Sequence, residues 1–406
     1  DLHGDLRGII DHLDHIQDLG IDVIYMTPSF KSDSCHKYDT IDYYQIDPSF
    51  GTTEDLRELV QEAHKRGMKI VMDAVFNHTG REFFAFEDIM EKGEKSKYLD
   101  WYYIEKFPLK SERGEIPNYK CFGYYGGMPK LNLKNPEVEK FITDVACYWI
   151  KECNIDGWRM DVGDEISHYF WKNFRRAVKA VKKDMLIIGE IWHYAGDFLE
   201  GDEWDTVMNY PFYLNLIDLL ADEKINVSQF IQNLGYLKGR LNKKCYPLMW
   251  NLIDSHDTAR FLHLCKDNKK KQHLAAAFQL LLPGMPMIYY GDEFAMPGAN
   301  DPDCRRGMYW DEEYQDKEMF EWYKQLLKVR KNHACIVEGE PMELAARDEE
   351  ETIVLTRKNG EETLALIFNC SSSARMFNEY AQKYDLLREN PFDGKIEGLD
   401  AAVIVL

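Results

Sequence analysis

Short apolar runs recur along the first three quarters of the chain, and each has the length of a single β-strand. The run KIVMDAV, for example, is apolar at most consecutive positions rather than at alternate ones. Strands that are buried on both faces show this pattern, which is typical of a parallel sheet covered by helices. The predicted strands are 21–26, 69–75, 155–160, 186–191, 206–209, 249–254 and 286–290.

Segments with a helical spacing of apolar residues separate these runs, so strand and helix patterns alternate. The predicted helices are 5–19, 54–66, 136–152, 167–183, 228–241, 271–282 and 316–331. Side chains of residues 52–55 supply capping oxygens for one helix start, and Gly67 stands where that helix ends. The tally is one strand short of an eight-fold barrel, and we expect the missing first strand to precede Asp1.

Three of the predicted strands lead directly to a carboxylate. Asp161 closes the segment IDGWRMD, Glu190 closes MLIIGE, and Asp257 closes LMWNLIDSHD. The strands of a parallel barrel deliver their last side chains to one rim, and enzymes with this fold carry their chemistry there. The pattern therefore predicts an α/β fold of the TIM (β/α)8 type, with an acidic active site at the carboxyl ends of the strands.

Two parts of the chain depart from the alternation of strands and helices. The connection after the second predicted strand is much longer than a usual strand-to-helix loop and is rich in aromatic residues, Gly and Pro. We interpret residues 79–132 as an insertion at the rim, after the third strand of the barrel, and residues 1–78 and 133–335 as the barrel itself. Alternating strands joined by short turns predict a small C-terminal antiparallel β domain over residues 336–406.

Composition and charge narrow the classes of partner. The 70 Asp and Glu residues outnumber the 50 Lys and Arg residues, which gives a net charge of −20. This balance disfavours nucleic acid or an anionic membrane as the main partner, whereas a neutral substrate is indifferent to it. Aromatic residues make up 13% of the chain, and their flat rings are suited to stacking against sugars as well as to packing a core.

Cysteine usage and hydropathy bear on the compartment. The nine cysteines stand singly, in an odd number and with no CxxC pair, which favours reduced thiols over a disulfide framework. No run approaches the ~20 apolar residues of a membrane span, and no signal-peptide pattern is present. We therefore expect a cytoplasmic protein, although the chain starts at Asp1 without a methionine and an upstream segment is expected.

Four segments, taken in order, resemble the conserved blocks of the α-amylase family of retaining α-glucan hydrolases and transferases. These segments are DAVFNH (73–78), GWRMD (157–161), GEIW (189–192) and SHD (255–257). The segments YYGDE near 290 and DPDCRRGMYW near 305 extend the resemblance over nearly the whole chain. Any one block is a weak signal, but four blocks in the right order and at the predicted strand ends are specific.

Cleavage of a glycosidic bond needs one carboxylate to attack the anomeric carbon and one carboxylic acid to protonate the leaving oxygen. The resemblance implies that Asp161 is the nucleophile and that Glu190 is the acid/base. It further implies that Asp257 is the third carboxylate, which binds the 2- and 3-hydroxyls of the sugar. Asp73 resembles a structural residue that supports Arg159.

The resemblance also implies a set of side chains that bind the substrate. Three histidines resemble a ring of hydroxyl donors, a tyrosine resembles the platform under the cleaved sugar, and an Asp–Arg pair resembles the residues that hold the next sugar. The predicted substrate-binding residues are His36, Tyr38, His78, Arg159, Trp192, His256, Asp301 and Arg305. For Trp192 ordinary packing is an equally good interpretation, and a buried histidine is often a satisfied core residue.

The pentapeptide MPKLN (128–132) resembles the signature of the neopullulanase, cyclomaltodextrinase and maltogenic amylase group. This implies hydrolysis of α-1,4 links in cyclodextrins, pullulan or maltodextrins, with an α-glucan oligosaccharide or polysaccharide as the partner and no nucleic acid or membrane. Members of that group usually carry an N-terminal β domain that helps to form a dimer. We expect a homodimer only if such a domain exists upstream of this chain.

The implied chemistry requires no cofactor. In many relatives the residue at the position of Asn77 would ligate a structural calcium ion, helped by a histidine shortly after the nucleophile, where this chain has Glu165. Calcium prefers oxygen ligands, which are abundant in this acidic chain. The sequence nevertheless identifies no specific metal site.

Two alternatives to an active hydrolase stay open. One is a non-catalytic, amylase-like binding protein, although such proteins typically lose the catalytic carboxylates and carry a membrane span. The other is an inactive truncated fragment, because a missing first strand would open the barrel and expose a sheet edge.

Overall fold

The computed structural model of the protein describes residues 4–110 and 116–406. Over these residues the chain divides into two compact units. The first unit comprises the residues up to 191 together with 197–207, and the second comprises 192–196 together with 208–406. No helix in the described part of the chain is long and apolar enough to cross a lipid bilayer.

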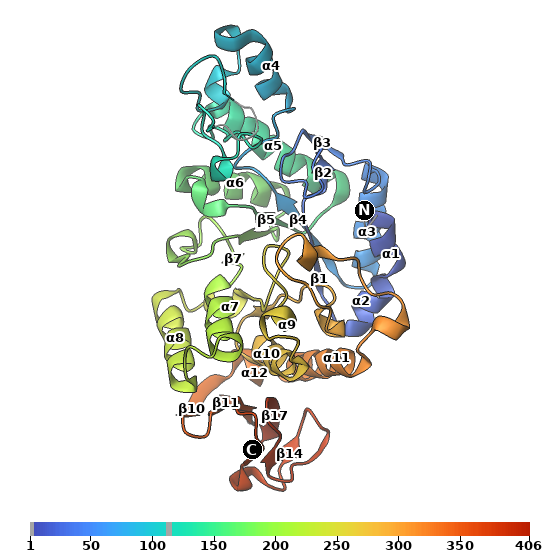
Figure 1. Ribbon diagram of the computed structural model, residues 1–406, viewed down its shortest axis with the longest axis vertical. Helices are drawn as coiled ribbons and strands as arrows, with labels where there is room; N and C mark the ends of the chain where they lie inside the picture. The colour runs from blue at the N-terminus through green and yellow to red at the C-terminus, as the bar shows by residue number, and fades with distance from the viewer. Residues whose placement is uncertain (1–3, 111–115) are drawn as a thin grey trace. The chain divides into compact units, whose positions relative to one another are not determined.

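A parallel sheet forms the centre of the first unit, and its strand order β1–β4–β5–β6–β7 follows the chain (Figure 1). Helices connect most of the successive strands, so the unit is built from β–α repeats as the pattern predicts. The parallel strands are β1 (Val23–Met26), β4 (Lys69–Ala74), β5 (Gly157–Met160), β6 (Leu186–Gly189) and β7 (Thr206–Val207). A short antiparallel pair, β2 (Phe30–Lys31) and β3 (Asp42–Ile46), lies between β1 and the next helix in the chain.

The helices of the first unit match the predicted ones closely, except that α4 has no predicted counterpart. They are α1 (Leu6–Asp11), α2 (Leu13–Leu19), α3 (Thr53–Lys65), α4 (Phe84–Lys92), α5 (Pro136–Cys153) and α6 (His168–Val181). The predicted start of α3 is confirmed, because Thr52 and Asp55 form a reciprocal capping box. Its end is confirmed as well, since Gly67 adopts a φ of 76° just beyond the last turn.

The predicted helix 5–19 is divided into two helices, α1 and α2, by a break at one residue. His12 lies between α1 and α2, with φ −111° and ψ 14°. Its Nδ1 atom lies 2.7 Å from the carbonyl oxygen of Gly8, so the side chain engages the oxygen that the next turn of helix would use. The apolar spacing continues across this break, and the hydropathy pattern alone therefore predicts a single helix.

The second unit continues the parallel pattern in its first half. Met208 bridges Trp250 in parallel, and β8 (Trp250–Asn251) pairs in parallel with β9 (Met285–Pro286). The helices are α7 (Tyr210–Leu216), α8 (Val227–Arg240), α9 (Phe261–Leu264), α10 (Lys269–Leu281), α11 (Lys317–Asn332) and α12 (Cys335–Glu338).

The predicted strand 286–290 is wrong over most of its length, because β9 ends at Pro286. Gln279 of α10 donates from Nε2 to the carbonyl of Met287 at 2.7 Å, so a buried side chain takes the place of a neighbouring strand there. Residues 287–289 follow without strand structure, although they are partly or fully buried. A hydropathy pattern records burial and cannot tell whether a buried segment is paired as a strand.

The predicted C-terminal antiparallel β structure is confirmed (dark red in Figure 1). Within the fully described segment 340–405, six strands pair in the order β10–β11–β12–β17–β14–β15. Their inner face is packed by apolar residues that include Ile367, Phe377 and Phe392. The strands of this sheet are β10 (Glu340–Arg347), β11 (Thr352–Asn359), β12 (Glu362–Asn369), β14 (Tyr384–Asp385), β15 (Asn390–Pro391) and β17 (Asp400–Val405). A separate antiparallel pair is formed by β13 (Arg375–Met376) and β16 (Lys395–Ile396).

The long connection that we interpret as an insertion contains α4 and several isolated antiparallel bridges. His78 bridges Lys130, and Tyr102 bridges Leu131, so the segment MPKLN returns alongside the residues that follow β4. Residues 111–115 of the predicted insertion lie outside the described residues. Its placement at the rim, and the predicted domain boundaries, stay predictions.

Trp204 fixes the ends of the strands that carry the predicted acids of the first unit. Its ring is 1% exposed and stacks on Phe198, with ring centroids 4.1 Å apart. The last residue of β6, Gly189, and the turn residue Gly163 both lie against this ring, and a Cβ atom at either position would overlap it. The absence of a side chain at Gly189 therefore lets the strand that leads to Glu190 pack directly on the indole.

Replacement of Gly189 by Ala tests this packing. The added methyl group forces Trp204 or the strand to shift, and we expect the free energy of unfolding to fall by about 1–3 kcal/mol. Denaturant unfolding measures the change. Gly235→Ala is the matched control, because that position in α8 has open space around it and alanine favours a helix. Equal stability of Gly189→Ala and Gly235→Ala would contradict the role given to Trp204.

Candidate active site

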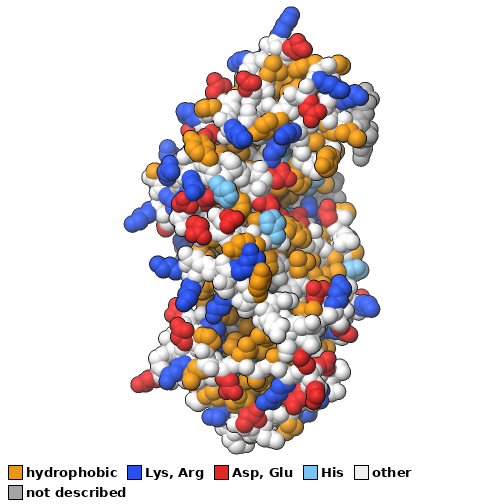
Figure 2. Space-filling model, turned by 90° about the vertical axis from the view of Figure 1, so that its left-hand side faces the viewer, with side chains coloured by type: hydrophobic (Ala, Val, Ile, Leu, Met, Phe, Trp, Pro, Cys, Tyr) orange, Lys and Arg blue, Asp and Glu red, His pale blue; other side chains and the backbone are white. Residues whose placement is uncertain are grey.

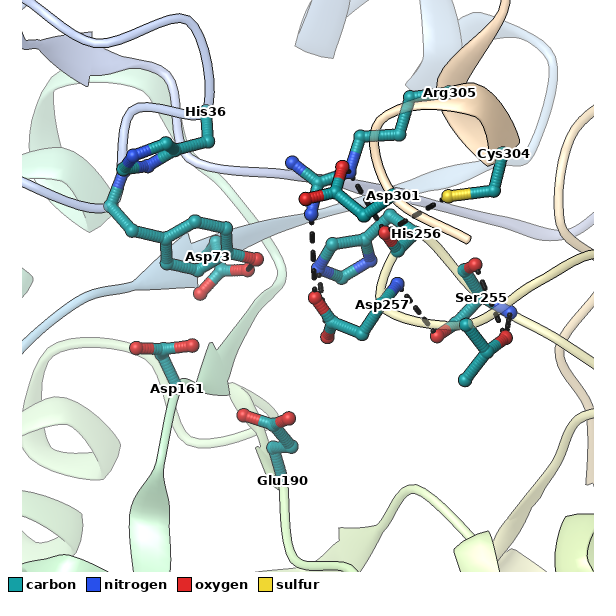
Figure 3. A network of polar contacts seen from close by, with 12 residues as sticks. His36, Asp73, Asp161, Glu190, Ser255, His256, Asp257, Asp301, Cys304 and Arg305 are labelled. Carbon is teal, nitrogen blue, oxygen red and sulfur yellow. Dashed lines mark hydrogen bonds and ion pairs between the residues drawn. The ribbon is translucent and has the colours of Figure 1, made fainter. Parts of the chain in front are cut away.

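Asp161 and Glu190 occupy equivalent positions on adjacent parallel strands. Asp161 directly follows β5 and Glu190 directly follows β6. The preceding residues, Met160 and Gly189, are backbone partners in the sheet. The two carboxyl groups consequently project from neighbouring strand ends, as Figure 3 shows, and both residues are buried.

One buried guanidinium holds these two acids together with a third. Arg159 has no solvent exposure, and it is the backbone partner of Asp73 on β4. Its Nη1 lies 2.9 Å from Asp73 Oδ2 and 2.9 Å from Asp161 Oδ1, and its Nη2 lies 3.0 Å from Glu190 Oε2. Three carboxyl groups therefore share one permanent positive charge in a place that water does not screen.

Asp73 lies deepest in this cluster. The hydroxyl of Tyr25 donates to its Oδ2 at 2.6 Å, and the hydroxyl of Tyr38 does so at 3.3 Å. Burial raises the pKa of Asp73 to about 6, although the Arg159 guanidinium opposes the shift. Its contacts are all with protein groups that surround Arg159, which agrees with the supporting role that the sequence predicts for it.

Glu190 is oriented by a second donor besides Arg159. The backbone N–H of Val162 donates to Glu190 Oε2 at 2.9 Å. Val162 adopts φ 48° and ψ 44°, a left-handed conformation that is costly for a β-branched residue. The residue after the predicted nucleophile is thus held in a strained turn that points its N–H at the predicted acid.

The predicted residues His36, Tyr38 and His78 form a linked group in the first unit. The N–H of Tyr38 donates to His36 Nδ1 at 3.1 Å, so the proton of a neutral His36 ring is on Nε2. The Nε2 atom of His78 lies 3.0 Å from the carbonyl oxygen of Tyr38, which can only accept a hydrogen bond. Burial lowers the pKa of His78 to about 4, so its ring is neutral and its one proton is donated to Tyr38. His78 orients Tyr38 here, and its direct contact with substrate stays a prediction.

Lys130 of the MPKLN segment links the loops after β4 and β5. Its ammonium group donates to Asn77 Oδ1, to Glu165 Oε2 at 2.9 Å and to the carbonyl of Glu165 at 3.2 Å. All three protons of the ammonium are therefore engaged. The oxygens of Asn77 and Glu165 already bind a cation that belongs to the chain, so they do not fit the calcium site that the family suggests. Among residues 4–110 and 116–406 no group of three or more His, Cys, Asp or Glu side chains is arranged to hold a metal ion.

The remaining predicted residues lie in the second unit, most of them around Asp257 (Figure 3). Arg305 lies 3.5 Å from Asp257 Oδ1 through Nη2 and 3.0 Å from Asp301 Oδ1 through Nε. The same Nε donates to the carbonyl of His256 at 2.8 Å. The Nε2 atom of His256 lies 3.2 Å from Asp257 Oδ2. The structure thus brings together Asp257, His256, Asp301 and Arg305, although 40 or more residues of the chain separate the first pair from the second.

Trp192 stacks on Tyr210, also in the second unit. The ring centroids are 3.8 Å apart and the rings are inclined by 12°. Tyr210 is fully buried, whereas Trp192 is 41% exposed. The indole is packed on one side and accessible in part, so both interpretations of Trp192, as packing and as a platform for substrate, describe part of its environment.

Sequence reasoning missed several residues that shape the cluster around Arg159. Tyr25 stands in a predicted strand, and a tyrosine in an otherwise apolar run is a signal that its hydroxyl needs a buried partner. Lys130 was visible only as part of a signature segment. No pattern in the sequence indicates that Val162 adopts a left-handed conformation.

Residues 1–314 match the family model described as "Alpha amylase, catalytic domain". The chain is 47% identical over 371 residues to a cyclomaltodextrinase from Geobacillus thermopakistaniensis, covering 91% of this chain and 63% of the relative. It is 48% identical over 338 residues to neopullulanase 2 from Thermoactinomyces vulgaris, covering 83% of this chain and 57% of the relative. The chain therefore spans about three fifths of the length of these curated relatives.

A solved structure resembles the chain over its entire length. It is a ligand-free cyclic α-maltosyl-(1→6)-maltose hydrolase from Arthrobacter globiformis, with a TM-score of 0.91 and 35% sequence identity. The match covers 100% of this chain and 90% of that structure. Together with the family model, it confirms the predicted TIM-barrel fold class with a C-terminal antiparallel β domain.

Replacement of Arg159 by Met tests the dependence of the acidic cluster on one guanidinium. The change leaves three carboxyl groups buried near one another without a cation, and we expect the free energy of unfolding to fall by about 3–5 kcal/mol. Arg347→Met is the control, because Arg347 forms an exposed pair with Glu350 and its loss should cost less than about 1 kcal/mol. A similar small loss in both variants would mean that Arg159 is not the centre of the cluster.

Replacement of Lys130 by Met tests the link between the two loops. The side-chain oxygen of Asn77 is then buried without its donor, and we expect a loss of about 1–3 kcal/mol in unfolding free energy. Lys134→Met removes a nearby exposed charge and serves as the control. Thermal unfolding of both variants gives the comparison, and an unchanged melting temperature for Lys130→Met would argue against the link.

Proposed function

Because the chain belongs to the α-amylase family, we propose that it is a retaining glycoside hydrolase that cleaves α-1,4-glucosidic bonds. The substrates are cyclodextrins, pullulan or maltodextrins. The observation that carries the proposal is the sharing of the Arg159 guanidinium by Asp161 and Glu190. This arrangement supplies two acids on adjacent strand ends, one for each half of a double displacement.

Asp161 is the nucleophile. Its Oδ1 is paired with Arg159 at 2.9 Å, which favours the ionised form. The carboxylate forms a bond to the anomeric carbon while the bond from that carbon to the leaving glucosyl oxygen breaks. The product of this step is a covalent glycosyl-enzyme with inverted configuration at the anomeric carbon.

Glu190 is the acid in the first step and the base in the second. Its Oε2 accepts a hydrogen bond from Val162 N–H and forms an ion pair with Arg159, so we assign the transferable proton to Oε1. That proton goes to the leaving oxygen. In the second step the carboxylate takes a proton from water, the water oxygen attacks the anomeric carbon, and Asp161 leaves with restoration of the original configuration.

Asp257 is the third carboxylate, and its task is to bind the sugar hydroxyls. The guanidinium of Arg305 and the imidazole of His256 hold it from two sides. Asp301 and Arg305 form an ion pair that supplies further hydrogen-bonding groups for a neighbouring glucose unit. Carboxylates and guanidinium groups are well suited to vicinal hydroxyls, because each offers two acceptors or two donors in a fixed geometry.

The choice of substrate rests on the names of the relatives and on the MPKLN segment. The similar proteins are a cyclomaltodextrinase, a neopullulanase and a hydrolase of a cyclic maltosyl-maltose, all of which are named for α-glucan substrates. On the face in Figure 2, acidic and basic side chains are interspersed, and the net charge of −20 disfavours a nucleic acid partner. A neutral oligosaccharide is compatible with this surface.

The cofactor and the compartment belong to the same proposal. No metal ion enters either chemical step, and Lys130 supplies the cation between Asn77 and Glu165. All nine cysteines are free thiols, which is usual for a cytoplasmic protein and unusual for a secreted one. Dimerisation through an upstream domain, as in the group that MPKLN suggests, stays a proposal.

The stereochemistry of the product, together with two variants, tests the mechanism. Proton NMR of the first product from maltotriose or β-cyclodextrin, with EDTA present throughout, should show the α-anomer. Asp161→Asn should lower kcat by roughly a thousandfold or more for every substrate, because no nucleophile remains. Glu190→Gln should abolish cleavage of maltodextrin but retain release of fluoride from α-maltosyl fluoride, since fluoride leaves without a proton.

Asp184→Asn is the control for these variants, because Asp184 is an exposed carboxylate outside both clusters. A β-anomeric first product would overturn the retaining mechanism. Normal turnover by Asp161→Asn would reject Asp161 as the nucleophile. A folded wild-type protein that binds maltodextrin but hydrolyses neither cyclodextrin, pullulan nor maltodextrin would favour the non-catalytic alternative.

A further inference from the structure

Two buried carboxyl groups lie against each other behind the loop that carries His256 and Asp257. Asp254 follows β8, and Asp292 begins the short 3₁₀ helix Asp292–Phe294. Each residue is 1% exposed. The two carboxyl groups lie close enough within the second unit to share a hydrogen bond if one of them carries a proton.

The charges around this pair do not balance if both groups are ionised. Among residues 4–110 and 116–406 the cation in contact is Arg260, whose Nη1 lies 3.2 Å from Asp292 Oδ1. Glu293 adds a further buried carboxylate beside Asp292, and its Oε2 accepts the N–H of Gly291 at 2.7 Å. The other groups beside the pair in the described part of the chain are uncharged: Tyr323 from α11, Tyr213 from α7 and Gln272 from α10.

The hydrogen bonds lead to the same conclusion. Asp254 Oδ1 and Asp292 Oδ2 are buried, and neither accepts a hydrogen bond from a donor among the described residues. Two carboxylate groups that are close together and shielded from water repel each other unless one of them carries a proton. Burial raises the pKa of both groups, that of Asp292 well above its ordinary value, which agrees with a bound proton at neutral pH.

We propose that Asp254 and Asp292 share one proton and, through it, act as positioning residues for the loop that carries His256 and Asp257. The proposal rests on the role in substrate binding given above to Asp257. Neither aspartate touches the substrate. Both hold the carboxyl-terminal end of the loop, Asp292 at Arg260 and Asp254 at Phe261.

The contacts that transmit this effect are short and buried. Asp254 Oδ2 accepts the N–H of Phe261 at 2.6 Å, which closes the loop from 255 to 260 on itself. Asp292 anchors Arg260, which in turn donates to the carbonyls of Tyr290 at 2.8 Å and Cys304 at 3.1 Å. Cys304 and Arg305 both donate to the carbonyl of His256. The carboxyl pair thus fixes the last residues of the loop, and the adjacent segment fixes His256.

The shared proton makes the loop sensitive to alkaline pH. In the unfolded chain both carboxyl groups titrate near an ordinary pKa of ~3.9, so across the neutral range the folded state binds one proton more. The contribution to stability is therefore complete at acidic pH and is lost as pH rises through the raised pKa of the pair. Above that point two carboxylates face one guanidinium, and the loop loses its support.

Asp292→Asn is the decisive variant, because an amide donates permanently where the shared proton donates reversibly. In the wild type we expect the melting temperature to fall as pH rises above neutrality. In Asp292→Asn the decrease of stability with pH should be less steep, by the contribution of one proton bound in the folded state. The decline of kcat/KM for maltodextrin on the alkaline side should also begin at higher pH, with activity at lower pH changed no more than about twofold.

Asp47→Asn is the matched control. Asp47 is also buried but pairs with Lys37 at 2.9 Å, and hydrogen bonds with Lys37 and Ser49 hold its pKa at about 2 despite burial. This change should lower stability without altering the alkaline dependence. An alkaline dependence of Asp292→Asn equal to that of the wild type would overturn the proposal.

Infrared spectroscopy of the wild-type protein provides a test that does not depend on any variant folding. Protein labelled with ¹³C at the aspartate carboxyl groups should show the isotope-shifted band of a protonated carboxylic acid at pH 8, where Asp73, with a pKa of about 6, is ionised. Absence of that band would show that the pair is fully ionised and would overturn the proposal. Because neither this band nor the melting curves require turnover, failure here is distinct from failure of the proposed hydrolysis.

Discussion

The first unit depends on the buried guanidinium of Arg159. Three carboxyl groups from three adjacent parallel strands converge on it, and the backbone register that pairs Asp73 with Arg159 brings the first of them there. Placing so many like charges away from water would be prohibitive without a permanent cation at their centre. The cation cannot lose its proton, so it holds the acids together over the whole range in which the protein is folded.

In the second unit, buried carboxyl groups are compensated in a different way. Arg260, also fully buried, contacts Asp292, which in turn contacts Asp254. Here the carboxyl groups outnumber the cation and no substrate chemistry is assigned to them. A proton is the remaining way to balance the charge, and it changes the pair from a permanent support into one that depends on pH.

Hydrogen bonds from uncharged donors and from one lysine orient the side chains around the proposed site. His78 uses its single proton on the carbonyl of Tyr38, so a residue that the resemblance places at the substrate orients another residue in the structure. Lys130 joins the loops that follow β4 and β5 with three hydrogen bonds. The strained turn at Val162 aims a backbone N–H at Glu190. Each of these contacts fixes the direction of a side chain that the chemistry would use.

The sequence by itself determined the fold class, the strands that carry the acids and the identity of Asp161, Glu190 and Asp257 as candidates. It could do so because burial on both faces of a parallel strand leaves a continuous apolar run, and a carboxylate at the end of such a run is conspicuous. It predicted a strand that extends beyond the end of β9 and a helix that continues through His12. Both predictions failed because hydropathy records burial and does not show which group forms hydrogen bonds with the backbone. Only the tertiary structure decided that Arg159 binds Asp161 and Glu190 together, that Tyr25 and Lys130 belong to their surroundings, and that Asp254 meets Asp292. These contacts join residues that are far apart in the chain, and their distances follow from strand register and packing, which no local pattern encodes.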